Sequence, residues 1–106
     1  MNLNVKDRIA IMDMLPQAGS ISEMVDIMEI VKKVRLGQEE KTKIEFRESQ
    51  GSISWNASSD KGKEIEFSFE ELTILKTAVK KLDSEKRVNA ANLDICLKIN
   101  SLWKYC

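Results

Sequence analysis

Few side chains in this sequence could carry chemistry. It has two cysteines, Cys96 and Cys106, and no histidine. Without imidazole there is no Ser–His or Cys–His nucleophile system, no histidine general base and no histidine metal ligand. Cys96 falls in an apolar helical pattern, where a thiol usually packs rather than reacts. The sequence therefore predicts a protein that is not an enzyme and has no catalytic residues.

Carboxylates are the remaining candidates for metal binding. Glu64 and Glu66 alternate in a predicted strand, and Glu39 and Glu40 fall in a connection. Neither pair has the spacing of a calcium loop, and the cysteines do not form a CxxC pair for zinc. The four glycines stand singly at turns, so there is no glycine-rich phosphate loop. We expect no metal and no cofactor, and we interpret the acidic pairs as a solvated surface that discourages edge pairing of strands.

The cysteines and the distribution of apolar residues indicate the cellular compartment of the protein. Two free thiols are typical of a reducing compartment. The first residues show no basic cluster followed by an apolar run, so no signal peptide is predicted. The apolar-rich stretch from Ile21 to Val34 is interrupted by five charged residues, whereas a membrane span needs about 20 mostly apolar residues. We expect a cytoplasmic protein without a membrane partner.

The composition predicts one small domain over residues 1–106. Hydrophobic residues make up 42 % of the chain, which is enough for one core. Lys plus Arg and Asp plus Glu each number 17, so the formal net charge is zero. Proteins that bind DNA or RNA usually carry an excess of basic residues, and the balance therefore argues against a nucleic-acid partner.

Two helices are predicted before residue 40. Apolar residues at helical spacing predict the first from about Asn4 to Leu15. Pro16 ends it, because the residue before a proline disfavours helical backbone. Ser20 then begins a second helix that runs to about Leu36.

Both ends of the second helix carry sequence signals. Ser20 followed by Glu23 is a capping box, in which each side chain binds a free backbone N–H of the new helix. Gly37 suits the left-handed residue that often follows a helix. Lys32 and Lys33 complement the negative end of the helix dipole.

The hydrophobic period then changes from about 3.6 to 2, which predicts three short strands that form an antiparallel meander. Gln50-Gly51 is a turn signal between the first two strands. The alternation also predicts that Trp55 packs in the core. The apolar members of the three strands are Ile44 and Phe46, Ile53 and Trp55, and Ile65 and Phe67.

Two helices are predicted after the strands. Ser68 and Glu71 repeat the capping-box spacing and begin a helix that ends near residues 83–85. A last helix runs from Ala90 to about Trp103. The sequence therefore predicts an α+β fold with two N-terminal helices, a three-stranded antiparallel meander and two C-terminal helices.

The second helix carries more apolar residues than one buried face needs. Eight of the fourteen residues from Ile21 to Val34 are apolar, and an uncovered apolar patch usually marks an interface. We therefore expect a protein–protein interaction module that forms a homodimer, with Glu29 and Lys33 at the rim of the contact. Near the end of the chain, an aromatic pair either closes the core or anchors a contact. The predicted interface residues are Ile27, Ile30, Val34, Trp103 and Tyr105.

The order of these motifs resembles a group of small uncharacterised bacteriophage and prophage proteins, over roughly residues 3–102. The resemblance implies a phage accessory, assembly or host-takeover protein, and it carries over no catalytic or binding residue. The motifs are Leu15-Pro16, Glu39-Glu40, Ile44 with Phe46, Ile53 with Trp55, Ile65 and Phe67 with Glu71, and Leu82-Asp83.

Two alternative functions stay open. One is a small-ligand or nucleotide-binding protein, of the sponge type that counters host defence, with its pocket between sheet and helices. The other is a winged-helix-like DNA binder, since two helices are followed by a hairpin. The charges argue against the DNA binder, because both the second helix and the hairpin would have to meet phosphates. The first turns of the second helix carry Glu23 and Asp26, and no Lys or Arg lies between Glu48 and Asp60 in the hairpin region.

Overall fold

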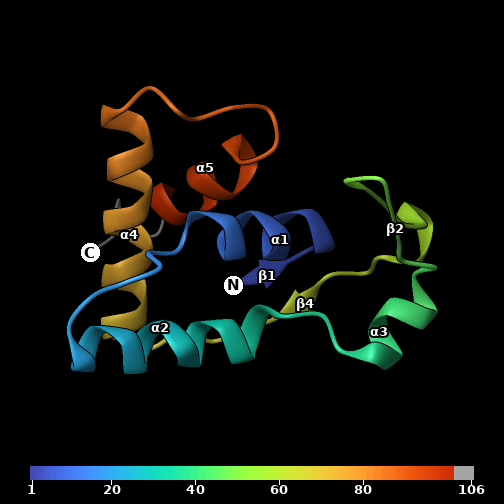
Figure 1. The fold of residues 1–106 in the computed structure, drawn as a ribbon, viewed down its shortest axis with the longest axis horizontal. Coiled ribbons are helices and arrows are strands. Elements are labelled where there is room, and N and C mark those ends of the chain that lie inside the picture. The colour runs from blue at the N-terminus through green and yellow to red at the C-terminus, as the bar shows by residue number, and fades with distance from the viewer. Residues whose placement is uncertain (102–106) are drawn as a thin grey trace.

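Helices form most of the fold, and short pairs of strands connect them. The structure is a computed structural model that describes residues 1–101 (Figure 1). It confirms the α+β class, whereas the number and order of the strands differ from the prediction. The elements in chain order are β1 (Asn2–Leu3), α1 (Val5–Met14), α2 (Ile21–Val34), α3 (Gln38–Lys43), β2 (Arg47–Ser49), β3 (Ser52–Ser54), a 3-10 turn (Ala57–Ser59), β4 (Lys63–Glu64), α4 (Phe69–Ser84) and α5 (Leu93–Ser101).

Local capping sets where the long helices begin. Ser20 precedes α2 and Ser68 precedes α4, and each hydroxyl accepts a hydrogen bond from a backbone N–H three residues later, at 3.2 Å in both cases. Glu23 and Glu71 complete the exchange by accepting from the backbone N–H of their serine. Both predicted capping boxes are confirmed. The sequence also predicted the limits of α1, α2 and α4 closely.

The end of α2 differs from the prediction. Gly37 has a φ of −77° and is the N-cap of α3, so it is not left-handed. The last carbonyl groups of α2 are instead satisfied by Arg8 of α1. Its Nε donates to the Val34 carbonyl at 2.8 Å, and its Nη2 donates to the Arg35 carbonyl at 2.7 Å. A helix whose free carbonyls meet a side-chain donor does not need a left-handed glycine.

The last helix begins later than predicted. The expected start is Ala90, but α5 begins at Leu93. The side chain of Asn89 accepts the backbone N–H of Asn92 at 3.2 Å and holds the intervening residues in a turn. The predicted end at Trp103 lies outside the described residues.

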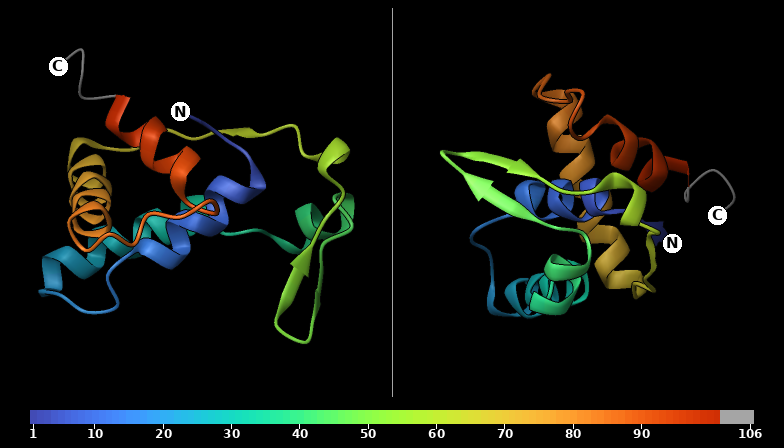
Figure 2. Two further views of the ribbon diagram at one scale, coloured as in Figure 1. Left: turned by 90° about the horizontal axis from the view of Figure 1, so that it is seen from above. Right: turned by 90° about the vertical axis from the view of Figure 1, so that its right-hand side faces the viewer.

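The predicted three-stranded meander is wrong in strand number and pairing. β2 and β3 do form a hairpin around Gln50-Gly51, where both residues have a positive φ, of 49° and 79°. β4 pairs with β1 and not with β3, so two separate two-stranded ladders replace the meander. The alternation gives no sign of β1, because a strand of two residues has no period to detect. Figure 2 shows the β2–β3 hairpin projecting from the helices.

The alternation marks burial rather than strand pairing. Ile65 and Phe67 follow β4 and pack in or against the core, although neither belongs to a strand. Ile44 is also buried, but it ends α3. A segment that passes along a group of helices buries alternate side chains whether or not another strand lies beside it.

Trp55 is not the core residue that the alternation predicts. It follows β3 and is half-buried, outside the core cluster. Ile53, within β3, is exposed. All residues of β2 and β3 are exposed, so this hairpin has no covered face in which Trp55 could be buried.

The core gathers around α1. This helix contacts α2, α4 and α5, which places it at the centre of the helices (Figures 1 and 2). β1 and the segment after β4 add residues to the same cluster. The largest apolar side chains that are fully buried are Leu3, Ile11, Ile30, Leu75, Ile95, Ile99 and Val34.

Three ion pairs connect the helices, and each uses a carboxylate that also caps a helix. The acidic residue is the third residue of its helix, where its side chain accepts the backbone N–H of the N-cap residue. The same carboxylate then accepts a basic side chain from another helix, so one group sets both the start of its helix and the position of a neighbour. The pairs are Asp7 with Lys98, Glu40 with Arg8, and Glu71 with Lys33.

Substitutions at Ile30 and Trp55 should differ in cost. We expect Ile30→Ala to lower the free energy of unfolding by about 2–5 kcal/mol, because it leaves a cavity where a fully buried side chain stood. Trp55→Ala should cost less, since Trp55 is only half-buried. Urea denaturation of both variants measures the difference. A larger loss for Trp55→Ala would contradict its place outside the core.

Two lysines allow a matched test of buried and exposed pairing between α1 and α5. Lys98 pairs with buried Asp7, whereas Lys6 pairs with exposed Asp94 at 3.5 Å. Lys98→Met should cost about 1–3 kcal/mol, because it leaves a buried carboxylate without its charged partner. Lys6→Met should cost less than about 1 kcal/mol. Equal losses in thermal or urea denaturation would show that burial of Asp7 does not matter.

Candidate functional site

The predicted interface residues of α2 lie in the core. Ile27, Ile30 and Val34 are 3 %, 0 % and 0 % exposed within the single chain. They pack against α1 and α4, so they cannot also form a contact between two copies, and their place in the predicted interface is corrected. Trp103 and Tyr105 lie outside the described residues.

The opposite face of α2 is apolar and uncovered. Ile21, Val25 and Met28 are 88 %, 58 % and 50 % exposed. Their spacing of four and three residues places them in one row along the helix, because such positions are neighbours on a helix surface. We call these three residues the α2 stripe. The predicted surplus of apolar residues on this helix is therefore present, on a different set of side chains.

The acidic and basic residues of α2 lie toward opposite ends of the helix. Glu23, Asp26 and Glu29 stand in its first two thirds, and Lys32 and Lys33 stand in its last turn. Glu29 and Lys32 form an exposed ion pair at 3.2 Å beside the α2 stripe. The helix thus carries opposite charges at its two ends.

Lys33 does not belong to this exposed surface. Its ammonium group donates to the Glu71 carboxylate at 2.5 Å and lies 5.7 Å from the centre of the Phe67 ring. Both partners come from the segment around the start of α4. Lys33 therefore connects α2 to α4, and of the two predicted rim residues Glu29 alone lies beside the α2 stripe.

Other exposed apolar side chains of residues 1–101 are more dispersed. Leu93 and Leu97 lie on α5, and three more lie on different elements. Single exposed apolar residues are usual on protein surfaces. The α2 stripe is distinguished by three such residues in consecutive turns of one helix. The three dispersed residues are Met12, Ile53 and Phe69.

An apolar cleft lies among α1, α2 and α4, with a volume of about 480 Å³. Met14, Ile27 and Ile74 are among its lining residues, and Glu23 and Lys81 also border it. It is a gap between helices, whereas the sequence predicted a ligand pocket between sheet and helices.

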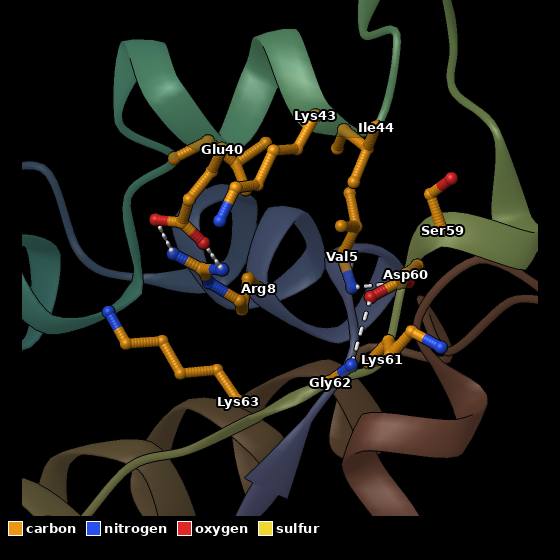
Figure 3. A pocket seen from close by; sticks show the side chains of 11 residues that line it. Val5, Arg8, Glu40, Lys43, Ile44, Ser59, Asp60, Lys61, Gly62 and Lys63 are labelled. Carbon is orange, nitrogen blue, oxygen red and sulfur yellow. Dashed lines mark hydrogen bonds and ion pairs between the residues drawn. The ribbon is translucent and has the colours of Figure 1, made fainter.

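A second cavity lies beside α3, with a volume of about 380 Å³ (Figure 3). Residues of α1, of α3 and of the segment around β4 line it. At its edge, the Arg8 guanidinium donates to both Glu40 carboxylate oxygens, at 2.5 and 3.1 Å. Sequence reasoning placed Glu39 and Glu40 in a connection and missed this pair. The available signal was Glu40 three residues after Gly37, since glycine is an acceptable N-cap.

The Arg8–Glu40 pair dominates the electrostatics of this cavity. The hydrogen bond from Arg8, aided by the Gly37 N–H and the charge of Lys63, outweighs burial and lowers the pKa of Glu40 from 4.5 to about 2. At the start of α4, burial alone would raise the pKa of Glu71. The hydrogen bonds from Lys33 and Ser68 reverse that effect and lower it. Both carboxylates therefore keep their charge in mildly acidic solution.

Cys96 and the acidic side chains were the candidates for chemistry in the sequence. Cys96 is buried, and burial followed by the charge of Asp83 raises the pKa of its thiol. No group of three acidic or thiol side chains within residues 1–101 is placed to hold a metal ion. In the same part of the chain, every helix is too short or too polar to cross a lipid bilayer. The winged-helix alternative stays a prediction, although the apolar row on α2 is unlike a surface that meets phosphates.

The lowered pKa values predict an acid-sensitive stability. A carboxylate whose pKa is lower in the folded state stabilises the fold above its unfolded pKa, near 4.5, and loses that contribution as the pH falls toward about 2. Glu40→Gln should therefore be less stable than the wild type above pH 4.5. The difference in free energy of unfolding between the two proteins should narrow toward pH 2. Exposed Glu39 offers a control, because Glu39→Gln should keep the wild-type profile. Urea denaturation measures this difference. A difference that stays constant over this pH range would contradict the role of Glu40.

Comparisons of the chain with protein-family models, curated proteins and solved structures give no match. The geometry of the described residues is therefore the evidence for a function. Two features of the described residues bear on it, the α2 stripe and the cavity beside α3.

Proposed function

We propose that this chain is a binding protein that acts through protein–protein contact and not through catalysis, with the α2 stripe as its contact surface. One observation carries the proposal, namely the row of Ile21, Val25 and Met28 exposed on a single helix. Contact with a partner would remove this apolar area from water, at a gain of about 25 cal/mol per Å².

The partner that fits the stripe is a second copy of the chain. Closed two-fold dimers place the same surface of both copies in contact. An antiparallel pair of α2 helices would bring the acidic first part of one helix near exposed Lys32 in the last turn of the other. A parallel pair would instead place like charges together, which is unfavourable. A crossing centred between Val25 and Met28 sets each of these residues opposite the other in the second copy.

The resemblance to small bacteriophage and prophage proteins suggests the setting of this contact. On that basis we propose an accessory, assembly or host-takeover protein in the cytoplasm of the host cell. Such a protein needs no catalytic residue, because binding by itself can block or recruit another protein. A dimer with a fixed α2 contact would present its remaining faces twice, which strengthens binding to a repeated partner.

Light scattering tests the dimer directly. We expect a mass of twice 12.1 kDa at micromolar concentration. Val25→Glu should give the monomer mass, because it places a charge in the centre of the apolar contact. Leu97→Glu is the matched control, since Leu97 and Val25 are both 58 % exposed. It should remain a dimer.

Two results would contradict the proposal. The first is a wild-type mass of 12.1 kDa that does not change up to millimolar concentration. The second is a dimer that persists in Val25→Glu, which would place the contact elsewhere. Circular dichroism should show the same helix content in both variants, because each substitution is at an exposed position.

A further inference from the structure

The cavity beside α3 carries an excess of positive charge at one edge. Arg8, Lys43 and Lys63 extend toward the same region, where Glu40 is the facing carboxylate (Figure 3). Three cations against one anion leave two positive charges in excess. Lys61 also lines the cavity but points away from this region.

The acidic groups of the cavity are already engaged. Glu40 accepts two hydrogen bonds from Arg8 and a longer one from the Gly37 N–H at 3.4 Å. Asp60 accepts the backbone N–H of Val5 at 2.9 Å and that of Gly62 at 3.2 Å. Both carboxylates therefore serve the fold.

The lysines at the cavity have no such partner. Within residues 1–101, neither Lys43 nor Lys63 has a carboxylate oxygen within 4.0 Å of its ammonium group. Lys63 is nevertheless near enough for its charge to act on Glu40. Two ammonium groups thus stand at one edge of a concave site with their charge unpaired.

Apolar side chains also line the cavity. Val5 and Ile44 are buried and Leu36 is half-buried, and all three line the cavity. The volume of about 380 Å³ lies in the range of small-molecule sites, which combine apolar walls with a few polar groups. A ligand that fills this space would need a charged end and an apolar body.

We propose that this cavity binds a small organic phosphate. The phosphate group would lie between Lys43 and Lys63, whose ammonium groups are compact phosphate-binding charges. The organic body would pack on Val5, Leu36 and Ile44. Arg8 and Glu40 hold α1, α2 and α3 around the site, as positioning residues. This site uses different residues from the α2 stripe and does not depend on the dimer.

Titration followed by backbone amide NMR tests the site, with adenosine 5′-monophosphate as the probe. We expect saturable shifts at the amides around Lys43 and Lys63. Adenosine and inorganic phosphate, each tested alone, should bind at least about tenfold more weakly, because each supplies one of the two contacts. Inorganic phosphate that binds as tightly as the nucleotide would contradict the role of the apolar side chains.

The double variant Lys43→Gln/Lys63→Gln isolates the charges. It should bind the nucleotide at least about tenfold more weakly, whereas Lys80→Gln, an exposed control on α4, should bind like the wild type. Arg8 and Glu40 stay unchanged, because both are needed by the fold. Equal affinity of the double variant and the wild type, or no saturable binding by the wild type at millimolar nucleotide, would overturn the proposal.

Discussion

The fold depends on carboxylates that cap one helix and bind a basic side chain from another. Asp7, the third residue of α1, caps that helix and accepts Lys98 of α5, and Glu71, the third residue of α4, caps that helix and accepts Lys33 of α2. Placed at the first turn of a helix, each carboxylate also meets the positive end of the helix dipole. A small domain buries limited apolar surface, so its helices need such directional contacts to fix their mutual positions. The third pair, Arg8 with Glu40, adds a hydrogen-bonded end to α2.

This arrangement explains why one helix can serve two purposes. Arg8 of α1 binds the carbonyl groups at the end of α2, and Lys33 of α2 binds Glu71 of α4. The buried row of α2, with Ile27, Ile30 and Val34, completes the core. The outer row of α2 lies outside the core and stays exposed as the α2 stripe. The same Arg8–Glu40 pair holds the edge of the cavity beside α3. The two proposed binding surfaces thus depend on one set of ion pairs.

The helices could be predicted from the sequence because their signals are local. Ser20 with Glu23 and Ser68 with Glu71 lie three residues apart, and a capping box acts over that distance. The strand pairing could not be predicted, because Ile65 alternates with polar residues for reasons of burial and not of sheet formation. The alternation of apolar residues does not distinguish these two causes.

The candidate site was predicted only in part, for a similar reason. Eight apolar residues on one helix indicate two apolar faces, but which face the other helices cover depends on tertiary packing. The prediction therefore placed Ile27 and Ile30 at the contact, whereas the structure exposes Val25 and Met28. The cavity beside α3 was missed because Arg8 and Glu40 are 32 residues apart. A bond over that distance leaves no periodic signal in the sequence.

The most direct measurement of the α2 contact is an intermolecular NOE experiment on a mixture of ¹³C-labelled and unlabelled protein. An antiparallel dimer predicts NOEs between the Val25 methyl groups of one copy and the Met28 methyl group of the other. The Ile27 and Ile30 methyl groups should give intramolecular NOEs alone, because both side chains are buried within one chain. Intermolecular NOEs at Ile27 and Ile30, or none at Val25 and Met28, would contradict the assignment of the exposed face of α2 as the contact surface.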